Sequence, residues 1–515
     1  MHTLTFTMLP DEFWYGGKIS AGVNMPVDAT RTYTDDSVSG YSDQSVPFFV
    51  SNKGRYIWSE EAFVTRFDKG TVTATSETAE IKLYEGYETL RGAYLTASKA
   101  HFPADGNMPD ETMFRGPQYC TWIELKKRQK QDAIVKYAES ILASGMPAGE
   151  ILIDDGWQTT FGDWRFRKNY FSDPKGMVDR LHALGFKVIL WIVPFVDVKA
   201  PDFAYLAKEN CLVRDANGKV ALRKWWDGRD AVLDFSNPKA REWFFSVTKG
   251  LVDTYGVDGF KQDGADARFY NKDDITFGHV TSTQQTELWA KSALSFRFNE
   301  LRASFKGGGV GVTQRLGDKS HNWEESNGLG SLIPNSLLLG ITGHPFSCPD
   351  MIGGGLRSDF WKPQRFYDHE LFIRWTECSA LLPMMQFSLS LWRLKNKRTA
   401  ELCVRTAKYH TEFCDYILKT ARESAKTGEP IVRYMEYSFP NEGFASVRQQ
   451  FMLGDDYLVA PVVEKGAKTK PVHLPKNTKW QAVDGTSLAN GTVYEGGGVV
   501  NIEAGLERLI VLKKI

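Results

Sequence analysis

Near the N-terminus, hydrophobic and polar side chains alternate in short runs. Residues 71–75 and 80–84 both place every second side chain on the same face, which is the period of a half-buried β-strand. No convincing helical stripe occurs before Tyr87. Residues 100–117, with three prolines and two glycines, are interpreted as a linker. The pattern predicts a β-sandwich-like N-terminal domain over residues 1–112.

From residue 118 the pattern changes to apolar runs of strand length that alternate with helical stripes. Residues 150–153 and 186–194 are such runs, and Asp173-Pro174 and Asn237-Pro238 each combine a helix N-cap type with a first-turn proline. Strands that are apolar throughout are typical of a parallel sheet covered by helices on both faces. Residues 113–432 are therefore predicted to form a (β/α)8 TIM barrel. Further strands are expected at 119–123, 309–313, 336–341 and 381–387.

Short strands return in the last part of the chain. They are separated by turns rich in Gly, Asn and Asp and are expected at residues 451–460, 472–474, 480–483 and 509–512. This pattern predicts a C-terminal β-sandwich over residues 433–515. The fold class expected for the whole chain is α/β, a TIM barrel flanked by an N-terminal and a C-terminal β-sandwich domain.

Charge and composition exclude several classes of partner. The chain has 63 basic and 63 acidic side chains, so we expect no nucleic acid and no anionic membrane surface as partners. Six cysteines form no CxxC pair, and nine histidines form no HxH or HExxH motif. We therefore expect no metal site, and no organic cofactor is implied. Aromatic residues make up 13% of the chain, with 15 tryptophans, and such a composition suits stacking on sugar rings.

The N-terminal residues bear on location. They lack the basic region and the apolar run of a signal peptide, and no apolar run reaches the length of a membrane span. We therefore expect a cytoplasmic protein that does not enter a membrane. The alternative is that a leader peptide has been removed from the sequence. The sequence leaves the oligomeric state undecided between a monomer and a homo-oligomer.

Polar and aromatic side chains recur where the predicted barrel strands end. In a TIM barrel the carboxyl ends of the strands form the active-site face, so these side chains are expected to share one pocket. For any one of them, a salt bridge or a helix cap is the alternative. Two carboxylates in one pocket is the arrangement for glycoside hydrolysis, although spacing in sequence leaves retention and inversion open. The strand-end residues are Asp154, Asp155, Trp157, Trp191, Lys261, Asp263, Arg315, Asp318, His344 and Asp350.

Several motifs stand in the order found in one known family. They are residues 51–60 (SNKGRYIWSE), 153–157 (IDDGW), 259–263 (GFKQD), Gly317-Asp318 with Trp323 after it, 349–354 (PDMIGG) and 450–462 (QFMLGDDYLVAPV). Because the motifs occur in this order, the chain resembles glycoside hydrolase family 31 from about residue 48 to its C-terminus. The resemblance implies a retaining α-glycosidase with a β-sandwich, a barrel and C-terminal β-domains. Within the family, the chain is most similar to an α-galactosidase-like branch. The similarity lies in the runs RKWWDG at 223–228, FKQD at 260–263 and SLIP at 331–334.

Position by position, the resemblance implies that Asp263 is the nucleophile and Asp318 the general acid/base. Arg315 stands only three residues before Asp318, whereas family members have a substrate-binding arginine well upstream. Gln386 stands about where α-glucosidases of the family have a histidine that binds sugar hydroxyls, which argues against plain glucose recognition. The residues implied to line the sugar subsite are Asp154, Asp155, Trp191, Trp226, Asp227, Lys261, Arg315 and Gln386.

The sequence therefore predicts an exo-acting retaining α-glycosidase that hydrolyses the terminal α-linked sugar of a small oligosaccharide or glycoside by double displacement. An α-galactoside is the first choice of substrate, and an α-glucoside or α-xyloside is the alternative. Transfer to a second sugar stays open, because that sugar and water compete for the same intermediate. A hypothesis of a different class is a non-catalytic carbohydrate-binding protein on the same fold. The presence of both Asp263 and Asp318 speaks against it.

Overall fold

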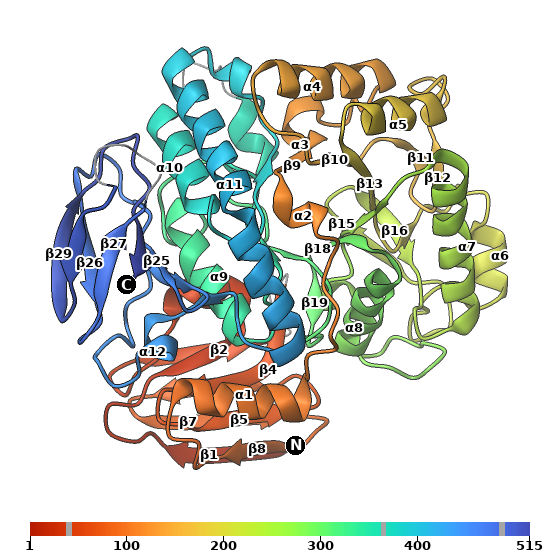
Figure 1. Ribbon diagram of the computed structural model, residues 1–515. Helices are drawn as coiled ribbons and strands as arrows, with labels where there is room; N and C mark the ends of the chain where they lie inside the picture. The colour runs from red at the N-terminus through yellow and green to blue at the C-terminus, as the bar shows by residue number, and fades with distance from the viewer. Residues whose placement is uncertain (38–43, 362–366, 484–489) are drawn as a thin grey trace.

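The computed structural model describes residues 1–37, 44–361, 367–483 and 490–515 of the 515-residue chain. Figure 1 shows a group of sheets that begins the chain, a central barrel with helices around it, and a second group of sheets at the C-terminus. The arrangement confirms the expected fold class, a TIM barrel flanked by β-domains.

Two sheets make up the N-terminal domain. The first has the strand order β1-β7-β6-β3, and the second has the order β19-β4-β5-β8 with β2 paired to β4. β19 comes from the barrel part of the chain and pairs with β4, so this sheet is tied to the barrel close to its strand ends. The bounds are β1 His2–Thr7, β2 Trp14–Lys18, β3 Thr32–Asp36, β4 Gln44–Ser51, β5 Tyr56–Ser59, β6 Val64–Asp68, β7 Thr71–Ser76, β8 Ile81–Tyr84 and β19 Ser304–Phe305. Helices α1 (Leu90–His101) and α2 (Thr112–Arg115) follow.

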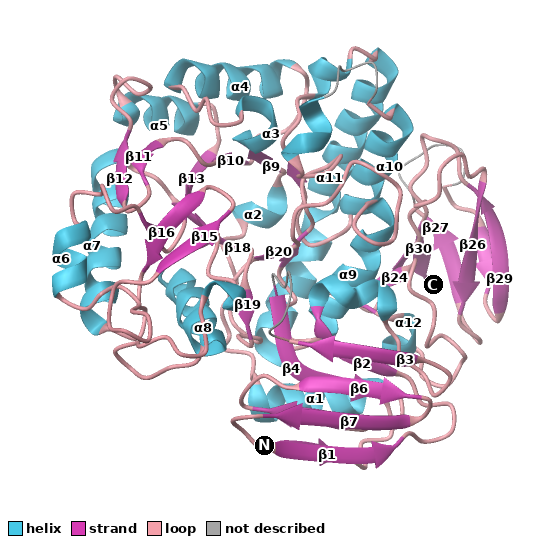
Figure 2. Ribbon diagram, turned by 180° about the vertical axis from the view of Figure 1, so that it is seen from behind, coloured by secondary structure: helices cyan, strands magenta, loops and turns pink. Residues whose placement is uncertain are grey.

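Eight strands form a nearly closed parallel barrel in the order β21-β20-β18-β17-β13-β10-β9-β22. The strands are β9 Gln118–Cys120, β10 Glu150–Ile153, β13 Lys187–Ile192, β17 Gly259–Gln262, β18 Phe298–Leu301, β20 Gln314–Arg315, β21 Ser347–Cys348 and β22 Gln386–Phe387. Figure 2 shows helices on the outside of these strands. The helices are α3 Thr121–Leu125, α4 Gln131–Ala143, α5 Pro174–Ala183, α6 Phe203–Lys208, α7 Pro238–Tyr255, α8 Ser282–Ser292, α9 Leu332–Ile341, α10 His369–Ser379 and α11 Lys397–Thr427.

Short antiparallel strands in the loops add to the barrel. β11 (Gln158–Thr160) pairs with β12 (Asp163–Phe166), and β16 (Gly228–Val232) pairs with both β14 (Phe195–Val196) and β15 (Leu222–Trp225). The β15–β16 hairpin contains the tryptophan pair Trp225-Trp226. This hairpin reaches the carboxyl-end face of the barrel, where it covers part of the cavity described below.

Helix caps follow the sequence prediction and fix where β17 begins. The Asp173 carboxylate accepts a hydrogen bond from the Gly176 amide at the start of α5, and the Asn237 side chain accepts one from the Lys239 amide at the start of α7. Gly256, with a φ of 78°, ends α7 in the left-handed conformation that favours glycine. The chain then enters β17, the strand that leads directly to Asp263.

Several predicted strands were wrong in type or in extent. Residues 336–341 lie within α9, whose ten residues are all buried. A helix that is apolar on every side shows no alternation of an apolar and a polar face, so its sequence pattern resembles that of a buried strand. The other differences are that β20 begins at Gln314 rather than in 309–313, that β9 ends at Cys120 before α3, and that only Gln386–Phe387 of 381–387 is a strand.

The C-terminal domain is antiparallel, as expected. One sheet has the order β23-β24-β25-β30-β27-β28, and β26 pairs with β29 in a second. The bounds are β23 Val432–Arg433, β24 Phe451–Leu453, β25 Tyr457–Val459, β26 Thr469–Leu474, β27 Lys479–Ala482, β28 Val493–Glu495, β29 Gly498–Glu503 and β30 Val511–Lys514, with α12 (Met435–Ser438) after β23.

The barrel interior holds charged side chains as well as apolar ones. The strand register places Trp191, Lys261 and Glu300 side by side on β13, β17 and β18. All three are 2% exposed or less. An indole, an ammonium group and a carboxyl group are thus neighbours in one layer of the barrel, near the strand ends.

Gly259, the first residue of β17, approaches the neighbouring strand very closely. A Cβ on Gly259 would lie 1.8 Å from the carbonyl oxygen of Phe298. We predict that Gly259→Ala lowers the free energy of unfolding by about 3 kcal/mol, a large cost for overpacking, as measured by chemical denaturation. The control is Gly250→Ala on α7, where an added Cβ meets nothing within 4 Å and a gain of up to about 1 kcal/mol is expected. Equal effects of the two changes would contradict the tight strand contact.

Candidate active site

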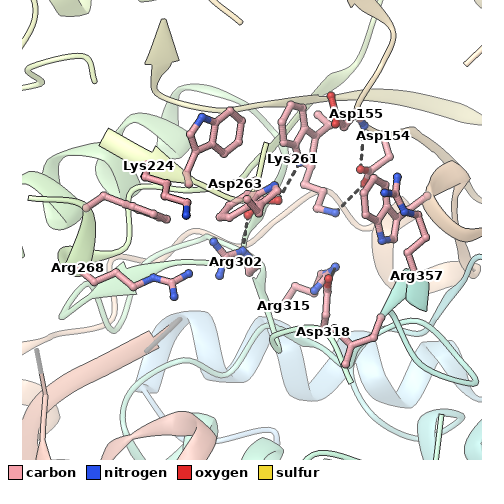
Figure 3. A pocket seen from close by; sticks show the side chains of 16 residues that line it. Asp154, Asp155, Lys224, Lys261, Asp263, Arg268, Arg302, Arg315, Asp318 and Arg357 are labelled. Atoms are coloured by element: carbon pink, nitrogen blue, oxygen red, sulfur yellow. Dashed lines mark hydrogen bonds and ion pairs between the residues drawn. The ribbon is translucent and has the colours of Figure 1, made fainter. Parts of the chain in front are cut away.

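A cavity of about 560 Å³ opens at the carboxyl ends of the barrel strands. Figure 3 shows the lining side chains converging on a common space. They lie at the ends of strands β13, β17 and β20 or in the segments that follow β9, β10, β17, β18, β20 and β21. The others belong to the β15–β16 hairpin. Residues that are far apart in the chain therefore meet at one place, as the barrel geometry predicts.

Asp263, the residue directly after β17, is held by donors on two sides. Its Oδ2 accepts a hydrogen bond from Trp191 Nε1 at 2.8 Å, and its Oδ1 accepts bonds from Arg302 Nε and from the Gly264 amide. Burial raises the pKa of Asp263, but the charges of Arg302 and Lys261 and the hydrogen bonds outweigh burial and hold this pKa well below its usual value. The carboxylate is therefore ionised and oriented at neutral pH, as a nucleophile requires.

Asp154 and Lys261 form a buried ion pair next to Asp263. Lys261 Nζ lies 2.8 Å from Asp154 Oδ2, and the two side chains are 3% and 4% exposed. The Cys120 thiol donates to the same oxygen at 3.2 Å. Burial lowers the pKa of Lys261, but the Asp154 carboxylate more than compensates and leaves this pKa above its usual value. Lys261 therefore stays charged at the cavity wall, where its ammonium group lies against the Asp154 carboxyl group.

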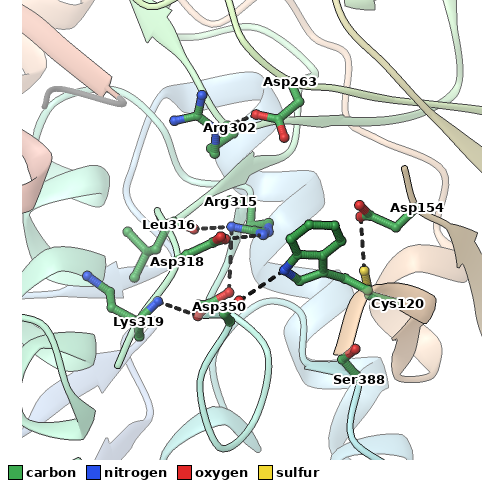
Figure 4. A network of polar contacts seen from close by, with 12 residues as sticks. Cys120, Asp154, Asp263, Arg302, Arg315, Leu316, Asp318, Lys319, Asp350 and Ser388 are labelled. Carbon is green, nitrogen blue, oxygen red and sulfur yellow. Dashed lines mark hydrogen bonds and ion pairs between the residues drawn. The ribbon is translucent and has the colours of Figure 1, made fainter. Parts of the chain in front are cut away.

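Asp318 is the more open of the two predicted catalytic carboxylates. Its side chain is 27% exposed, against 12% for Asp263. Figure 4 shows Arg315 between Asp318 and Asp350: Arg315 Nη2 donates to Asp318 Oδ1 at 2.7 Å, and Nη1 lies 3.5 Å from Asp350 Oδ1. Burial and the nearby Asp318 raise the pKa of Asp350 to about 7 against the charge of Arg315. Arg315 thus orients Asp318, whose carboxyl group can reach a departing group in the cavity.

Asp155 and Asp227 share one cation at the edge of the cavity. Lys127 Nζ lies 3.5 Å from Asp155 Oδ2 and contacts Asp227 Oδ1. Burial and the adjacent Asp227 raise the pKa of Asp155 to about 7, while Lys127 opposes them. Asp155 lines the cavity, whereas Asp227 lies behind the lining and acts on it through Lys127.

The structure brings together most of the residues proposed from the sequence. Asp154, Asp155, Trp191, Trp226, Lys261, Asp263, Arg315 and Asp318 all line the cavity. Gln386 does not: it is fully buried in β22, and its Nε2 donates to Gln118 Oε1 at 2.9 Å and Glu300 Oε2 at 2.8 Å. Because Gln386 belongs to the barrel interior, it gives no support to the argument against glucose. His344, which comes before β21 rather than after a strand, also lies outside the lining.

Arg302 is the main site residue that the sequence analysis missed. It follows β18, whose Asn299 and Glu300 interrupt the apolar run by which other strands were found. Its guanidinium contacts Asp263, and its Nη2 donates to Asp266 Oδ2 at 2.8 Å. Arg302 lies well upstream of Asp318, so the chain does have an upstream arginine at the site. Other lining residues were missed because they lie outside the barrel strands, in α3, the β15–β16 hairpin and short segments where no spacing points to them. They are Trp122, Lys224, Trp225, Arg268, Phe269, Leu356 and Arg357.

Neither a metal-binding cluster nor a membrane-spanning helix occurs among the described residues. Over residues 1–37, 44–361, 367–483 and 490–515, no group of three His, Cys, Asp or Glu side chains is arranged to hold a metal ion. Within the same ranges, no helix combines the length and the apolar character needed to cross a membrane.

Two family models match the chain. The glycosyl hydrolases family 31 TIM-barrel domain matches residues 108–418, and the glycosyl hydrolase family 31 C-terminal domain matches residues 428–514. The first match covers the barrel strands and every lining residue of the cavity.

Curated relatives carry several names within this family. Mouse myogenesis-regulating glycosidase is 32% identical over 75% of this chain and 55% of its own length. A sulfoquinovosidase from Agrobacterium fabrum is 26% identical over 80% of this chain and 64% of its own length. An isomaltosyltransferase from Sporosarcina globispora is also 26% identical, over 67% of this chain and 33% of its own length. The chain thus spans between a third and two thirds of the length of these relatives.

Solved structures share the fold. A Flavobacterium johnsoniae GH31 dextranase complexed with glucose superposes with a TM-score of 0.85 at 21% identity, over 99% of this chain and 66% of that chain. A second solved structure is a cycloalternan-forming enzyme from Listeria monocytogenes in complex with a pentasaccharide substrate. It has a TM-score of 0.84 at 19% identity, over 99% of this chain and 53% of that chain. At these identities the likeness concerns the fold alone.

The buried Lys261–Asp154 pair makes a testable contribution to stability. Lys261→Met leaves Asp154 buried without its cation, and breaking such a pair costs about 3–5 kcal/mol of unfolding free energy. Chemical denaturation measures the loss. Adding Asp154→Asn should recover part of it, because the uncompensated charge is then gone. The control is Lys249→Met, from an exposed pair with Asp253 on α7, which should change stability little. A double variant less stable than Lys261→Met alone would rule out this interpretation.

Proposed function

Because the chain belongs to glycoside hydrolase family 31, we propose that it is an exo-acting retaining α-glycosidase. The observation that carries the proposal is the pair of carboxylates in one cavity, Asp263 and Asp318, in different environments. Asp263 is buried and held ionised by cations, whereas Asp318 is more exposed and shares one arginine with another carboxyl group. Two carboxyl groups with separate environments can take separate roles, one as nucleophile and one as acid.

The proposed reaction has two displacements at the anomeric carbon. In the first, Asp263 attacks this carbon and its bond to the leaving group breaks, while Asp318 gives its proton to the departing oxygen. In the second, Asp318 takes a proton from water, the water oxygen attacks the same carbon, and Asp263 is released as a carboxylate. Proton transfer by Asp318 would contribute about 10²–10⁴-fold to the rate. Arg302 and Trp191 keep the attacking carboxylate in place.

The shape of the cavity supports attack at the end of a sugar chain. Its inner wall is formed by buried side chains, including Asp154, Lys261 and Arg315. A chain cannot pass through this layer, so a terminal sugar would fill the inner part and the rest of the substrate would extend to the mouth. Trp226, which is 47% exposed, offers an apolar face there.

We propose an α-galactoside as the substrate, with an α-glucoside or an α-xyloside as the alternative. The support is the similarity to the α-galactosidase-like branch in the runs RKWWDG and FKQD. Lys224, Trp225 and Trp226 of the first run and Lys261 and Asp263 of the second all line the cavity. The similarity to an isomaltosyltransferase favours a second candidate reaction, transfer of the sugar to another sugar. Trp226 could hold such an acceptor at the mouth.

The stereochemistry of azide rescue tests the two catalytic roles. We predict that Asp263→Ala lowers turnover of an activated aryl α-glycoside on the order of 10⁴-fold or more while the fold is kept. Added azide then takes the place of the missing nucleophile and yields the β-glycosyl azide. With Asp318→Ala the glycosyl-enzyme still forms, so azide attacks the opposite face and yields the α-glycosyl azide. NMR spectroscopy identifies both products.

The matched control for these variants is Asp179→Ala, an exposed aspartate on α5, which should retain the wild-type rate. Azides of the same configuration from Asp263→Ala and Asp318→Ala would overturn the assigned roles. Wild-type rates in Asp263→Ala would overturn the mechanism itself.

A panel of p-nitrophenyl α-glycosides tests the sugar. We predict a higher kcat/KM for the α-galactoside than for the α-glucoside and the α-xyloside, because of the shared cavity residues. A higher value for either of the other two would reverse the order of substrates and leave the mechanism intact. Binding of an α-sugar with turnover of none would favour the carbohydrate-binding hypothesis.

A further inference from the structure

We propose that the natural substrate carries an anionic group, such as a carboxylate, on its leaving-group side, where Lys224, Arg268 and Arg357 surround the mouth of the cavity. This inference rests on the proposed glycosidase function and adds the chemical class of the substrate to it. These three side chains form the cationic mouth of the cavity.

The cavity lining has more positive than negative side chains. Six lining residues are lysine or arginine, and four are aspartate. The whole chain has equal numbers of basic and acidic side chains, so this excess is local rather than a consequence of a basic protein. A cleft lined mainly by one sign of charge attracts ligands of the opposite sign.

The cations on the inner wall have structural partners. Lys261 pairs with Asp154 at 2.8 Å, and Arg315 donates to Asp318 at 2.7 Å. Arg302 contacts Asp263 itself. Each of these inner cations thus has a carboxylate partner within the protein, and its charge is balanced there.

The cationic mouth differs from the inner wall. Lys224 is exposed on β15, and Arg357 stacks on Trp122, with its guanidinium carbon 5.1 Å from the ring centroid. Within the part of the chain that the structure describes, neither Lys224 nor Arg357 makes an ion pair with a carboxylate. Arg268 lies 3.7 Å from Asp266, a carboxylate that also accepts a hydrogen bond from Arg302. Guanidinium groups bind carboxylates and phosphates well because their donors form a planar fork.

Figure 3 shows how these charges are distributed. Lys224 and Arg268 lie on one side of Asp263, and Arg357 lies on the other, near Asp154 and Asp318. An anionic group between them would be attracted from both sides. An exo-acting enzyme places the terminal sugar against the inner wall and directs the leaving group outward, past the partly exposed Asp318. The part of the substrate that meets the cationic mouth is therefore the leaving group.

Two aryl glycosides that differ in one group test the charge of the leaving group. They are the 4-carboxyphenyl and the 4-carbamoylphenyl α-galactosides, which have similar size and differ by one negative charge. The glucosides and xylosides of the same pair are used if the enzyme prefers those sugars. The quantity compared is the ratio of kcat/KM for the carboxylate to kcat/KM for the amide, in wild type and in variants, so that intrinsic leaving-group differences cancel.

We predict that Lys224→Gln and Arg357→Gln each lower this ratio about tenfold, the effect of losing one hydrogen bond to a charged group. Raising the salt concentration from about 0.01 M to about 1 M should also lower the wild-type ratio, because screening shortens the reach of the charges. The control is Lys219→Gln, which removes an exposed lysine just before β15 and outside the lining. Its ratio should equal that of the wild type.

Three outcomes would overturn the inference. One is a ratio that does not change in the Lys224 and Arg357 variants or with salt. Another is a preference for a neutral leaving group combined with an anion on the terminal sugar, as in an α-galacturonide. The third is an equal fall in the Lys219→Gln control. If no neutral or charged glycoside is turned over, the proposed function fails, and equilibrium binding of the same two compounds to the wild-type protein then decides the charge inference separately.

Discussion

The charge of Asp263 can be buried only because cations and donors lie beside it. An isolated carboxylate in a protein interior would become protonated, since burial disfavours the charged form. Here Arg302, Lys261 and Trp191 together hold it ionised. The three partners come from β13, β17 and the end of β18, and the parallel register of these neighbouring strands places them around one carboxylate. The barrel register is thus a condition for the chemistry of the site.

The second carboxylate is controlled by a different arrangement. Arg315 contacts Asp318 and lies 3.5 Å from both Asp350 and Glu300. Three carboxyl groups therefore fix the position of the Arg315 guanidinium, which donates a hydrogen bond to Asp318. Asp318 remains partly exposed to solvent. A pair of carboxyl groups in such unlike surroundings fits the division into nucleophile and acid that double displacement needs. Both arrangements use cations that are balanced within the protein. Lys224 and Arg357 at the mouth differ, because neither makes an ion pair with a carboxylate within the described part of the chain.

The sequence predicted the architecture and part of the site, for identifiable physical reasons. Asp154 was found because it follows a short apolar strand, and Asp263 because it ends the short strand that starts after a helix-ending glycine. Strand ends of a barrel share one face. α9 was taken for a strand because all of its residues are buried, so no helical stripe is visible. Arg302 was missed because β18 contains the polar residues Asn299 and Glu300. Their Oδ1 and Oε2 atoms accept hydrogen bonds from the Thr313 amide and Gln386, partners that only the folded barrel supplies. Lys224 lies on the β15 strand of a hairpin and Arg357 begins a 3-10 helix, and the approach of both segments to the cavity depends on tertiary structure alone.

Trapping of the glycosyl-enzyme would identify the nucleophile and show whether it is Asp263. The protein would be treated with galactose-configured reagents that form stable esters with the nucleophile of a retaining α-galactosidase, such as a cyclophellitol-type electrophile or an activated fluoro-sugar. Peptide mass mapping would then locate the label. We expect one label of the mass of the reagent, on the peptide that contains Asp263. A label on any other carboxylate, or none from galactose-, glucose- and xylose-configured reagents alike, would contradict it.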